Sequence, residues 1–103
     1  MEYELRTTDQ FDKWQSRLKD REAAKAIAIR LVRASNGHFG DTKSLGDGLG
    51  EMRIFSGKGY RIYFTIRNSE LILLLNGGHK GSQEKDIEKA RKLLKALEED
   101  NAK

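Results

Sequence analysis

Three cations on neighbouring predicted strands are the residues of this chain most able to do chemistry. Arg53 lies in one segment of alternating polarity, Arg61 lies in the next after a Gly-Lys-Gly turn, and Lys80 follows the end of a third. If the first two segments form a hairpin, the arginines are cross-strand neighbours about 5 to 8 Å apart. Like charges at that spacing destabilise a sheet unless an anion or a carboxylate lies between them. The cluster therefore predicts a phosphate site and indicates RNA as the ligand.

A purely structural interpretation of the same cations also exists. Glu51 shares their side of the strand and could pair with Arg53 or Arg61 on a solvated face. Lys80 favours the anion site, because it precedes a predicted helix whose N-terminal amides also attract anions. The glycines Gly77-Gly78 would let a backbone approach a phosphate, or would simply form a turn at the strand end.

Aromatic side chains beside the cations could stack on RNA bases. Tyr63 shares the parity of Arg61 and is expected to point outward with it, whereas Tyr60 has the opposite parity and could instead pack at the hairpin. The other side chains that we expect to contact RNA are Lys58, Arg67 and Gln83.

The elements that must position these residues can be predicted from hydrophobic spacing and caps. A short strand near residues 2–6 precedes two helices, the first capped by Thr8 or Asp9 and the second running from Asp20 to the stop signal Asn36-Gly37. A glycine-rich loop follows over residues 37–50. Strands are then predicted near residues 51–55, 60–67 and 71–75, with a last helix capped by Ser82.

The predicted order is β-α-α-β-β-β-α, which is an α+β domain with a small, mainly antiparallel sheet, an N-terminal helical hairpin and a C-terminal helix. We expect one domain over residues 1–98 and a disordered tail over residues 99–103. On the strand over 60–67, the residues of even number, Ile62, Phe64 and Ile66, are expected to point to the core.

Composition narrows the classes of function. The chain is 37% hydrophobic and 35% charged, its net charge is +4, and no apolar run approaches the ~20 residues that span a bilayer. The sequence has no cysteine and two histidines far apart, so we expect neither a metal nor another cofactor. No secretory signal can be drawn in the charged first twenty residues, and we expect a cytoplasmic protein without a membrane partner.

Four motifs in order carry a resemblance to a known family. They are Gly40-Asp41-Thr42-Lys43, Gly48-x-x-Glu51-x-Arg53, Gly59-Tyr60-Arg61-x-Tyr63-Phe64 and Gly77-Gly78-x-Lys80-x-x-Gln83-x-x-Asp86-Ile87. With these motifs the chain resembles the RelE/ParE superfamily of bacterial toxins, and within it the HigB-like branch named addiction module killer protein.

The resemblance implies the toxin of a type II toxin-antitoxin system, a ribosome-dependent mRNA endonuclease (mRNA interferase) that uses 2′-hydroxyl attack without a metal. Its implied partners are a cognate antitoxin, expected to be a helix-turn-helix protein, together with the ribosome and mRNA. Arg53 and Arg61 would hold the nonbridging phosphate oxygens and Lys80 would protonate the leaving 5′-oxygen. His79 or Lys43 would be the general base, although His79 could equally be a surface turn residue.

Two other functions stay open at the level of sequence. One is a ParE-like inhibitor of DNA gyrase, although that branch generally lacks the cationic set present here. The other is a non-catalytic module that binds an antitoxin or nucleic acid. The sequence also lacks any aromatic residue after Phe64, where RelE-type members have an aromatic near the last helix that helps catalysis.

Overall fold

The computed structural model describes residues 2–101 and contains five strands and three α-helices. In chain order the elements are β1 (Glu4–Thr7), α1 (Asp9–Ser16), α2 (Arg21–Ser35), β2 (Thr42–Gly46), β3 (Leu49–Ile54), β4 (Tyr60–Arg67), β5 (Leu71–His79), the 3-10 turn η1 (Lys80–Ser82) and α3 (Gln83–Asn101).

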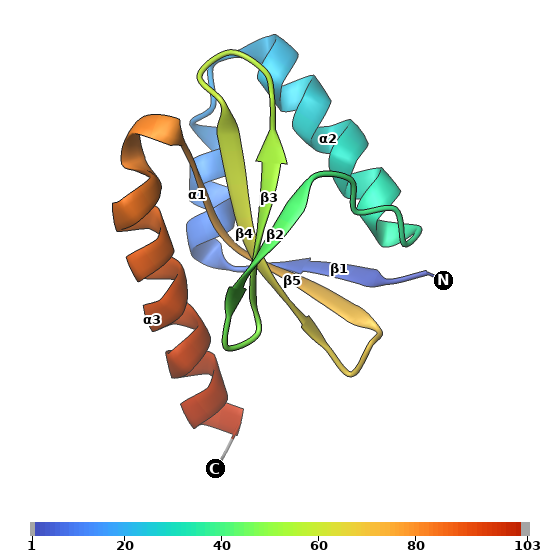
Figure 1. The fold of residues 1–103 in the computed structure, drawn as a ribbon, viewed down its shortest axis with the longest axis vertical. Coiled ribbons are helices and arrows are strands. Elements are labelled where there is room, and N and C mark those ends of the chain that lie inside the picture. The colour runs from blue at the N-terminus through green and yellow to red at the C-terminus, as the bar shows by residue number, and fades with distance from the viewer. Residues whose placement is uncertain (1, 102–103) are drawn as a thin grey trace.

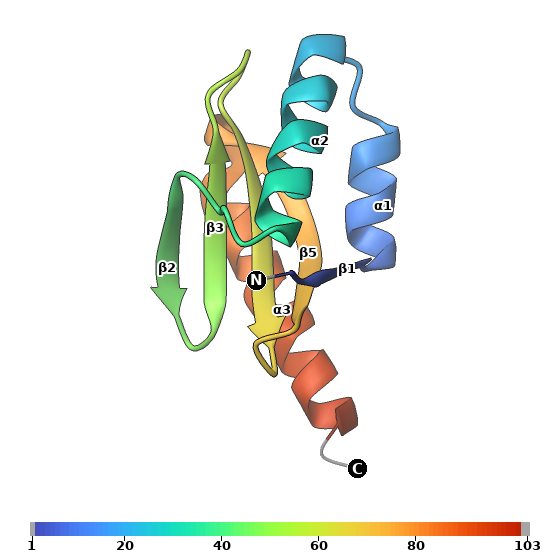
Figure 2. The ribbon, with the colours of Figure 1, turned by 90° about the vertical axis from the view of Figure 1, so that its right-hand side faces the viewer.

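The five strands form one sheet in the order β1-β5-β4-β3-β2. Strand β1 is parallel to β5, and all other neighbours are antiparallel. The helices α1 and α2 lie on one side of this twisted sheet and α3 lies on the other (Figures 1 and 2). This arrangement confirms the predicted α+β class with its helical hairpin and C-terminal helix.

One strand was missed in the glycine-rich segment after α2. Thr42 to Ser44 pair with Gly50 to Met52, so β2 forms the outer edge of the sheet where a loop was predicted. The turn that follows uses backbone conformations with positive φ at Gly46, Asp47 and Gly48. The sequence did not predict this strand because the glycines around it are typical of a loop. In addition, a strand of five residues is too short to show a clear alternation of polar and apolar side chains.

The core between the sheet and the helical hairpin follows the predicted spacing. Thr8 and Asp20 cap the two helices, since their side chains accept hydrogen bonds from the amides of Phe11 (3.1 Å) and Ala23 (3.0 Å). Phe11 is fully buried and belongs to one cluster with Met52 and Ile62 of the sheet and with residues of α2.

The other face of the sheet is less exposed than the alternation predicted. Leu49, Tyr63 and Leu75 pack with Ala90 and Leu94 of α3 in a second cluster. The expectation that Tyr63 points to solvent is therefore wrong, because α3 covers the face that alternation marked as outward. Ile66 was expected in the core and is instead exposed. The β4–β5 register shifts by one residue just after Tyr63, which marks a bulge there.

Strand β5 continues beyond its predicted end, because Gly77 and Gly78 are inside it and do not form a turn. A Cβ at Gly77 would lie 2.4 Å from the ring of Trp14, and a Cβ at Gly78 would lie 1.8 Å from Oδ2 of Asp86. Glycine is required here because side chains of α1 and α3 approach the strand from opposite sides.

Helix α3 extends into the segment that was predicted to be a disordered tail, because it ends at Asn101, and residues 102 and 103 lie outside the described residues. No helix within residues 2–101 is long and apolar enough to cross a membrane.

Candidate functional site

The two predicted arginines lie side by side in the sheet. Arg53 of β3 and Arg61 of β4 are direct cross-strand partners, which confirms the predicted pairing across the short connection, and Gly78 of β5 continues the same row. Because residues directly opposite each other point to one face, both arginine side chains leave the sheet on the side of α3. Helix α3 covers β4 and β5 there, and Arg53, with 38% of its side chain exposed, lies nearer to solvent.

Glu51 lies next to these arginines and is buried. It is 1% exposed, and its Oε2 atom lies 3.8 Å from Nε of Arg61 and accepts a hydrogen bond of 2.9 Å from Nε2 of Gln83. The alternative in which Glu51 pairs with one of the arginines is therefore correct in part, since Glu51 does pair with Arg61. It pairs in a buried position, however, and Arg61 has only 12% of its side chain exposed.

Arg53 is held by a second carboxylate and a third arginine. Its Nη2 atom lies 2.8 Å from Oδ1 of Asp41, and its backbone amide donates to the Asp41 carbonyl at 2.9 Å. From α2, Arg30 donates to the carbonyls of Arg53 (2.6 Å), Phe39 (2.9 Å) and Asp41 (3.2 Å). Burial lowers the pKa of Arg30, and the nearby Asp41 opposes that effect. Arg30 thus fastens the segment before β2 to the strand that carries Arg53.

Lys80 approaches the arginines from the start of η1. A Cβ placed on Gly59 would lie 3.8 Å from Cβ of Lys80 and 3.9 Å from Nη1 of Arg61, so both residues lie close to Gly59. Nη1 also donates to the Gly59 carbonyl at 3.1 Å. Lys80 is exposed, so its ammonium group is available to a ligand. The structure therefore brings three of the predicted catalytic residues to one region.

The two predicted general bases are separated by the sheet. Lys43 of β2 is exposed and is the cross-strand partner of Glu51, so it lies on the side of α3. His79 pairs with Tyr60, which belongs to the core on the side of α1 and α2. The prediction that His79 joins Arg61 at one site is therefore wrong. Its Nδ1 accepts a hydrogen bond of 3.0 Å from the amide of Gly81 and caps η1.

Neither predicted stacking tyrosine is free to receive a base. Tyr63 is 0% exposed beneath α3, and Tyr60 is 7% exposed with its ring centroid 6.3 Å from that of Trp14. Burial raises the pKa of Tyr63 well above its usual range, and the nearby Glu51 carboxylate raises that pKa further. The Tyr63 hydroxyl is close enough to feel this carboxylate but meets no partner in hydrogen-bonding geometry.

The remaining predicted RNA contacts are spread over the molecule. Gln83 belongs to the arginine region, although Glu51 occupies its amide. Lys58 lies in the connection between β3 and β4 and lines a cleft with Trp14 and Tyr60 on the side of α1. Arg67 lies six residues beyond Arg61 on β4, about 20 Å along the strand. Lys58 and Arg67 therefore do not extend the arginine site.

The sequence predicted the cations of the site but not the residues that hold them in place. The burial of Glu51 and its hydrogen bond to Gln83 depend on where α3 packs, and no local sequence pattern predicts that packing. Asp41 was visible in the first motif, but its bond to Arg53 requires the unpredicted strand β2. Within residues 2–101, no three His, Cys, Asp or Glu side chains form a group that could hold a metal ion.

This fold, in which a sheet lies between a helical hairpin and a single C-terminal helix, is also found in solved structures. The chain resembles a chain in the crystal structure of the toxin-antitoxin complex RelBE2 from Mycobacterium tuberculosis, with a TM-score of 0.60 and 19% identity over 78% of this chain and 100% of that one. The fold is thus of the RelE type, as the sequence motifs predicted.

The protein belongs to the family described as Phage derived protein Gp49-like (DUF891), which it matches over residues 9–95. It is also similar to an uncharacterized protein of Haemophilus influenzae, with 44% identity over 97 residues that cover 94% of this chain and 98% of that protein. Both the family and the fold support the predicted relationship to toxins of the RelE/ParE type.

Proposed function

We propose that this protein is the toxin of a type II toxin-antitoxin system and cleaves mRNA on the ribosome. The observation that carries the proposal is the pairing of Arg53 with Arg61 on one face of the sheet, with Lys80 beside Gly59 at its edge. The RelE-type fold and the family membership support the toxin class. The assignment to the HigB-like branch is part of this proposal.

The proposed reaction uses the RNA's own nucleophile. The 2′-oxygen attacks the adjacent phosphorus in line, the bond from phosphorus to the 5′-oxygen breaks, and the products are a 2′,3′-cyclic phosphate and a free 5′-hydroxyl. The protein orients the phosphate and neutralises charge in the transition state, without a metal. Arg53 and Arg61 bind the nonbridging oxygens, and Lys80 donates a proton to the leaving 5′-oxygen.

Two carboxylates determine how the arginines can act. Each guanidinium has five N–H donors, and the contacts to Asp41, Glu51 and the Gly59 carbonyl leave several of them unused. The carboxylates hold the planar groups in place before a ligand arrives, which lowers the cost of ordering them on binding. Of the two predicted bases, Lys43 lies on this face, and we assign removal of the 2′-proton to its neutral amine, which becomes an ammonium group in that step.

The ribosome is part of the proposal because the cations of the site do not by themselves align a flexible RNA. A codon held rigidly in the A site would contribute this orientation, which can lower a barrier by several kcal/mol. The proposed antitoxin is a helix-turn-helix protein, and the RelBE2 structure supports an antitoxin partner because it is a toxin-antitoxin complex that contains a chain of similar fold. Contact with a basic face would make its binding sensitive to salt.

The test compares cleavage of one mRNA with and without translating ribosomes. We expect little cleavage of the free mRNA and cuts within A-site codons once ribosomes are added. Lys80→Ala should reduce cleavage strongly, whereas Lys25→Ala, which removes an exposed lysine of α2, should not. Equal cleavage of free mRNA would contradict ribosome dependence. Growth arrest with intact mRNA and reduced supercoiling by gyrase would favour the ParE-like alternative.

Metal independence needs a separate test. Ribosomes loaded with mRNA are titrated with a chelator only to the point at which they stay intact, and cleavage is measured at each step. We expect cleavage to persist throughout this range. Loss of cleavage that zinc or manganese restores, while magnesium does not, would contradict attack by the 2′-hydroxyl without a metal.

A further inference from the structure

We propose that the open edge of β5, from Asn76 to His79, binds an extended acidic segment of a partner protein as an added strand. The proposal concerns a surface apart from the arginine site and does not depend on ribonuclease activity. It rests on an unpaired strand edge, a cleft around that edge, the charge of the cleft walls and one unsatisfied acceptor.

The edge is open because β1 is short. Strand β1 pairs with β5 from Leu71 to Leu74, and the chain then turns into α1. At this point the Thr8 amide donates to the Leu74 carbonyl at 3.1 Å, and the Thr8 hydroxyl donates to the Leu75 carbonyl. Beyond Leu75 no described strand lies on this side of β5, while the other side stays paired with β4 as far as His79. Such an edge offers backbone groups to another chain.

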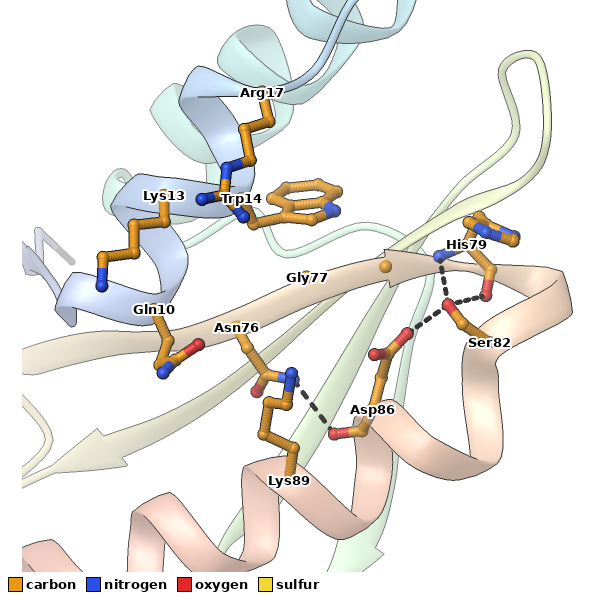
Figure 3. Close-up of a pocket in the computed structure, with 11 residues that line it drawn as sticks. Gln10, Lys13, Trp14, Arg17, Asn76, Gly77, His79, Ser82, Asp86 and Lys89 are labelled. Atoms are coloured by element: carbon orange, nitrogen blue, oxygen red, sulfur yellow. Dashed lines mark hydrogen bonds between the residues drawn. The ribbon is translucent and has the colours of Figure 1, made fainter.

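A cleft of about 270 Å³ surrounds the open edge. In Figure 3 the strand passes between α1, which carries Trp14, and α3, which carries Asp86. Gly77 and Gly78 form the middle of the edge; both are largely buried by the flanking side chains, and neither has a side chain of its own to obstruct an approaching backbone. The indole of Trp14 and the carboxylate of Asp86 flank these glycines above and below the strand. The cleft therefore leads to the backbone of this edge.

The walls of the cleft favour negative charge. Lys13 and Arg17 extend from α1, Lys89 extends from α3, and all three are exposed. Asp86 is the acidic residue of the lining, and its Oδ2 accepts a hydrogen bond from the Ser82 hydroxyl. Three cations against one carboxylate that is already hydrogen-bonded favour acidic side chains on the incoming segment.

Asn76 distinguishes a polypeptide from a bare anion. Its side chain lines the cleft and is 3% exposed, and its Nδ2 donates to the Asp86 carbonyl at 3.0 Å. Its Oδ1 is buried without a hydrogen-bond partner, an arrangement that is costly unless a donor arrives. The phosphate groups of RNA have no donor, so in RNA only the ribose hydroxyls and the bases could donate to Asn76, whereas a peptide has an N–H at almost every residue and can pair along the strand edge as well. We therefore favour an acidic polypeptide over RNA as the occupant.

The experiment uses a defined probe and the whole protein. The probe is an eight-residue peptide of alternating glutamate and valine with blocked ends, and Trp14 is the sole tryptophan, so its fluorescence reports on the cleft directly. We expect saturable binding in the range of micromolar to millimolar peptide. We also expect slower hydrogen exchange for the amides among residues 76–78 that face the edge, because a strand addition engages them.

Control probes and variants separate strand pairing from simple charge. A peptide N-methylated at alternate residues, which cannot donate, and a peptide with lysine in place of glutamate should each bind at least tenfold more weakly. A protein carrying both Lys13→Glu and Arg17→Glu should lose at least tenfold in affinity. The matched control carries Lys25→Glu and Arg33→Glu on α2, outside the cleft, and should bind as the unaltered protein does.

Several results would overturn the proposal. These are no binding up to millimolar peptide, binding without slower exchange at residues 76–78, or equal binding of the N-methylated probe. Tighter binding of an eight-nucleotide oligouridylate at the same residues would assign the cleft to RNA instead. Because none of these measurements involves cleavage, a failure here is distinct from a failure of the proposed ribonuclease.

Discussion

Replacing Arg61 tests its role in the site and its role in stability at once. Arg61→Ala removes a guanidinium that is 12% exposed and lies 3.8 Å from a carboxylate that is 1% exposed. Breaking a buried ion pair costs about 3–5 kcal/mol, because the remaining charge is left without compensation. Gln83 still donates to Glu51 after the replacement, and the separation of the pair is long. We therefore expect a smaller loss, about 1–3 kcal/mol.

A loss of this size is measurable. For a domain of roughly 100 residues, each kcal/mol lowers Tm by about 4–8 °C, and urea unfolding gives the free energy directly. The variant with both Arg61→Ala and Glu51→Gln removes the buried charge together with its partner. We expect it to recover about 1–2 kcal/mol of the loss, because an amide is cheaper to bury than an unpaired carboxylate.

Activity then separates the two roles. If Arg61 binds the phosphate, the stabilised double variant is folded and still fails to cleave mRNA on ribosomes. The single variant Glu51→Gln keeps Arg61 and should retain more cleavage than either variant that lacks it. A cost below about 0.5 kcal/mol for Arg61→Ala would refute the buried pair. Full cleavage by the double variant would refute the assignment of Arg61 to the phosphate.

Three further predictions follow from packing and burial. Tyr63→Phe removes an unsatisfied buried hydroxyl and should change the stability at neutral pH by less than about 1 kcal/mol. Because the pKa of Tyr63 is raised in the folded state, its hydroxyl stays protonated there while the tyrosine of the unfolded state ionises above a pH of about 10. The free energy of unfolding should therefore be unaffected by the ionisation of Tyr63 below that pH and should fall as the pH rises above it. Tyr63→Phe should reduce this fall, as measured by urea unfolding at high pH. Gly78→Ala should destabilise by about 2 kcal/mol or more because its Cβ would meet Asp86, and adding Asp86→Ala should recover part of that loss in thermal unfolding. Arg30→Ala removes the side-chain donor to three carbonyls, of which that of Asp41 keeps the Arg53 amide as a donor, and should lower the stability by about 2–3 kcal/mol, whereas Arg33→Ala on the exposed face should have little effect in the same assay.

The elements that the sequence predicted well are those in which local signals agree. The two N-terminal helices have side-chain caps at Thr8 and Asp20, and their apolar spacing places Phe11 in the core as expected. The pairing of Arg53 with Arg61 was also predictable, because a short connection between two alternating segments fixes their register. These features depend on neighbours in the chain and therefore appear in the sequence.

The features that were missed depend on packing between distant elements. Alternation divides β4 into two faces but does not tell whether a helix covers the second one, so Tyr63 was placed in solvent when it lies under α3. His79 was one of two candidate general bases implied by the family resemblance, although its pairing with Tyr60 puts it on the face of the sheet opposite to Arg61. For Gly77-Gly78 the sequence left open a close backbone approach to a ligand or a turn, because the packing of Trp14 and Asp86 against these glycines depends on helices distant in the chain.

The start of α3 connects the two surfaces for which we propose ligands. Gln83 holds Glu51 beside Arg61, and one turn later Asp86 approaches Gly78, which is both the cross-strand neighbour of Arg61 and part of the open edge. A strand added to β5 would lie on the far side of β5 from β3, so it would leave Arg53 uncovered. Control of the arginine site by a partner at this edge would therefore have to act through displacement of the first turns of α3, since those turns contact both surfaces.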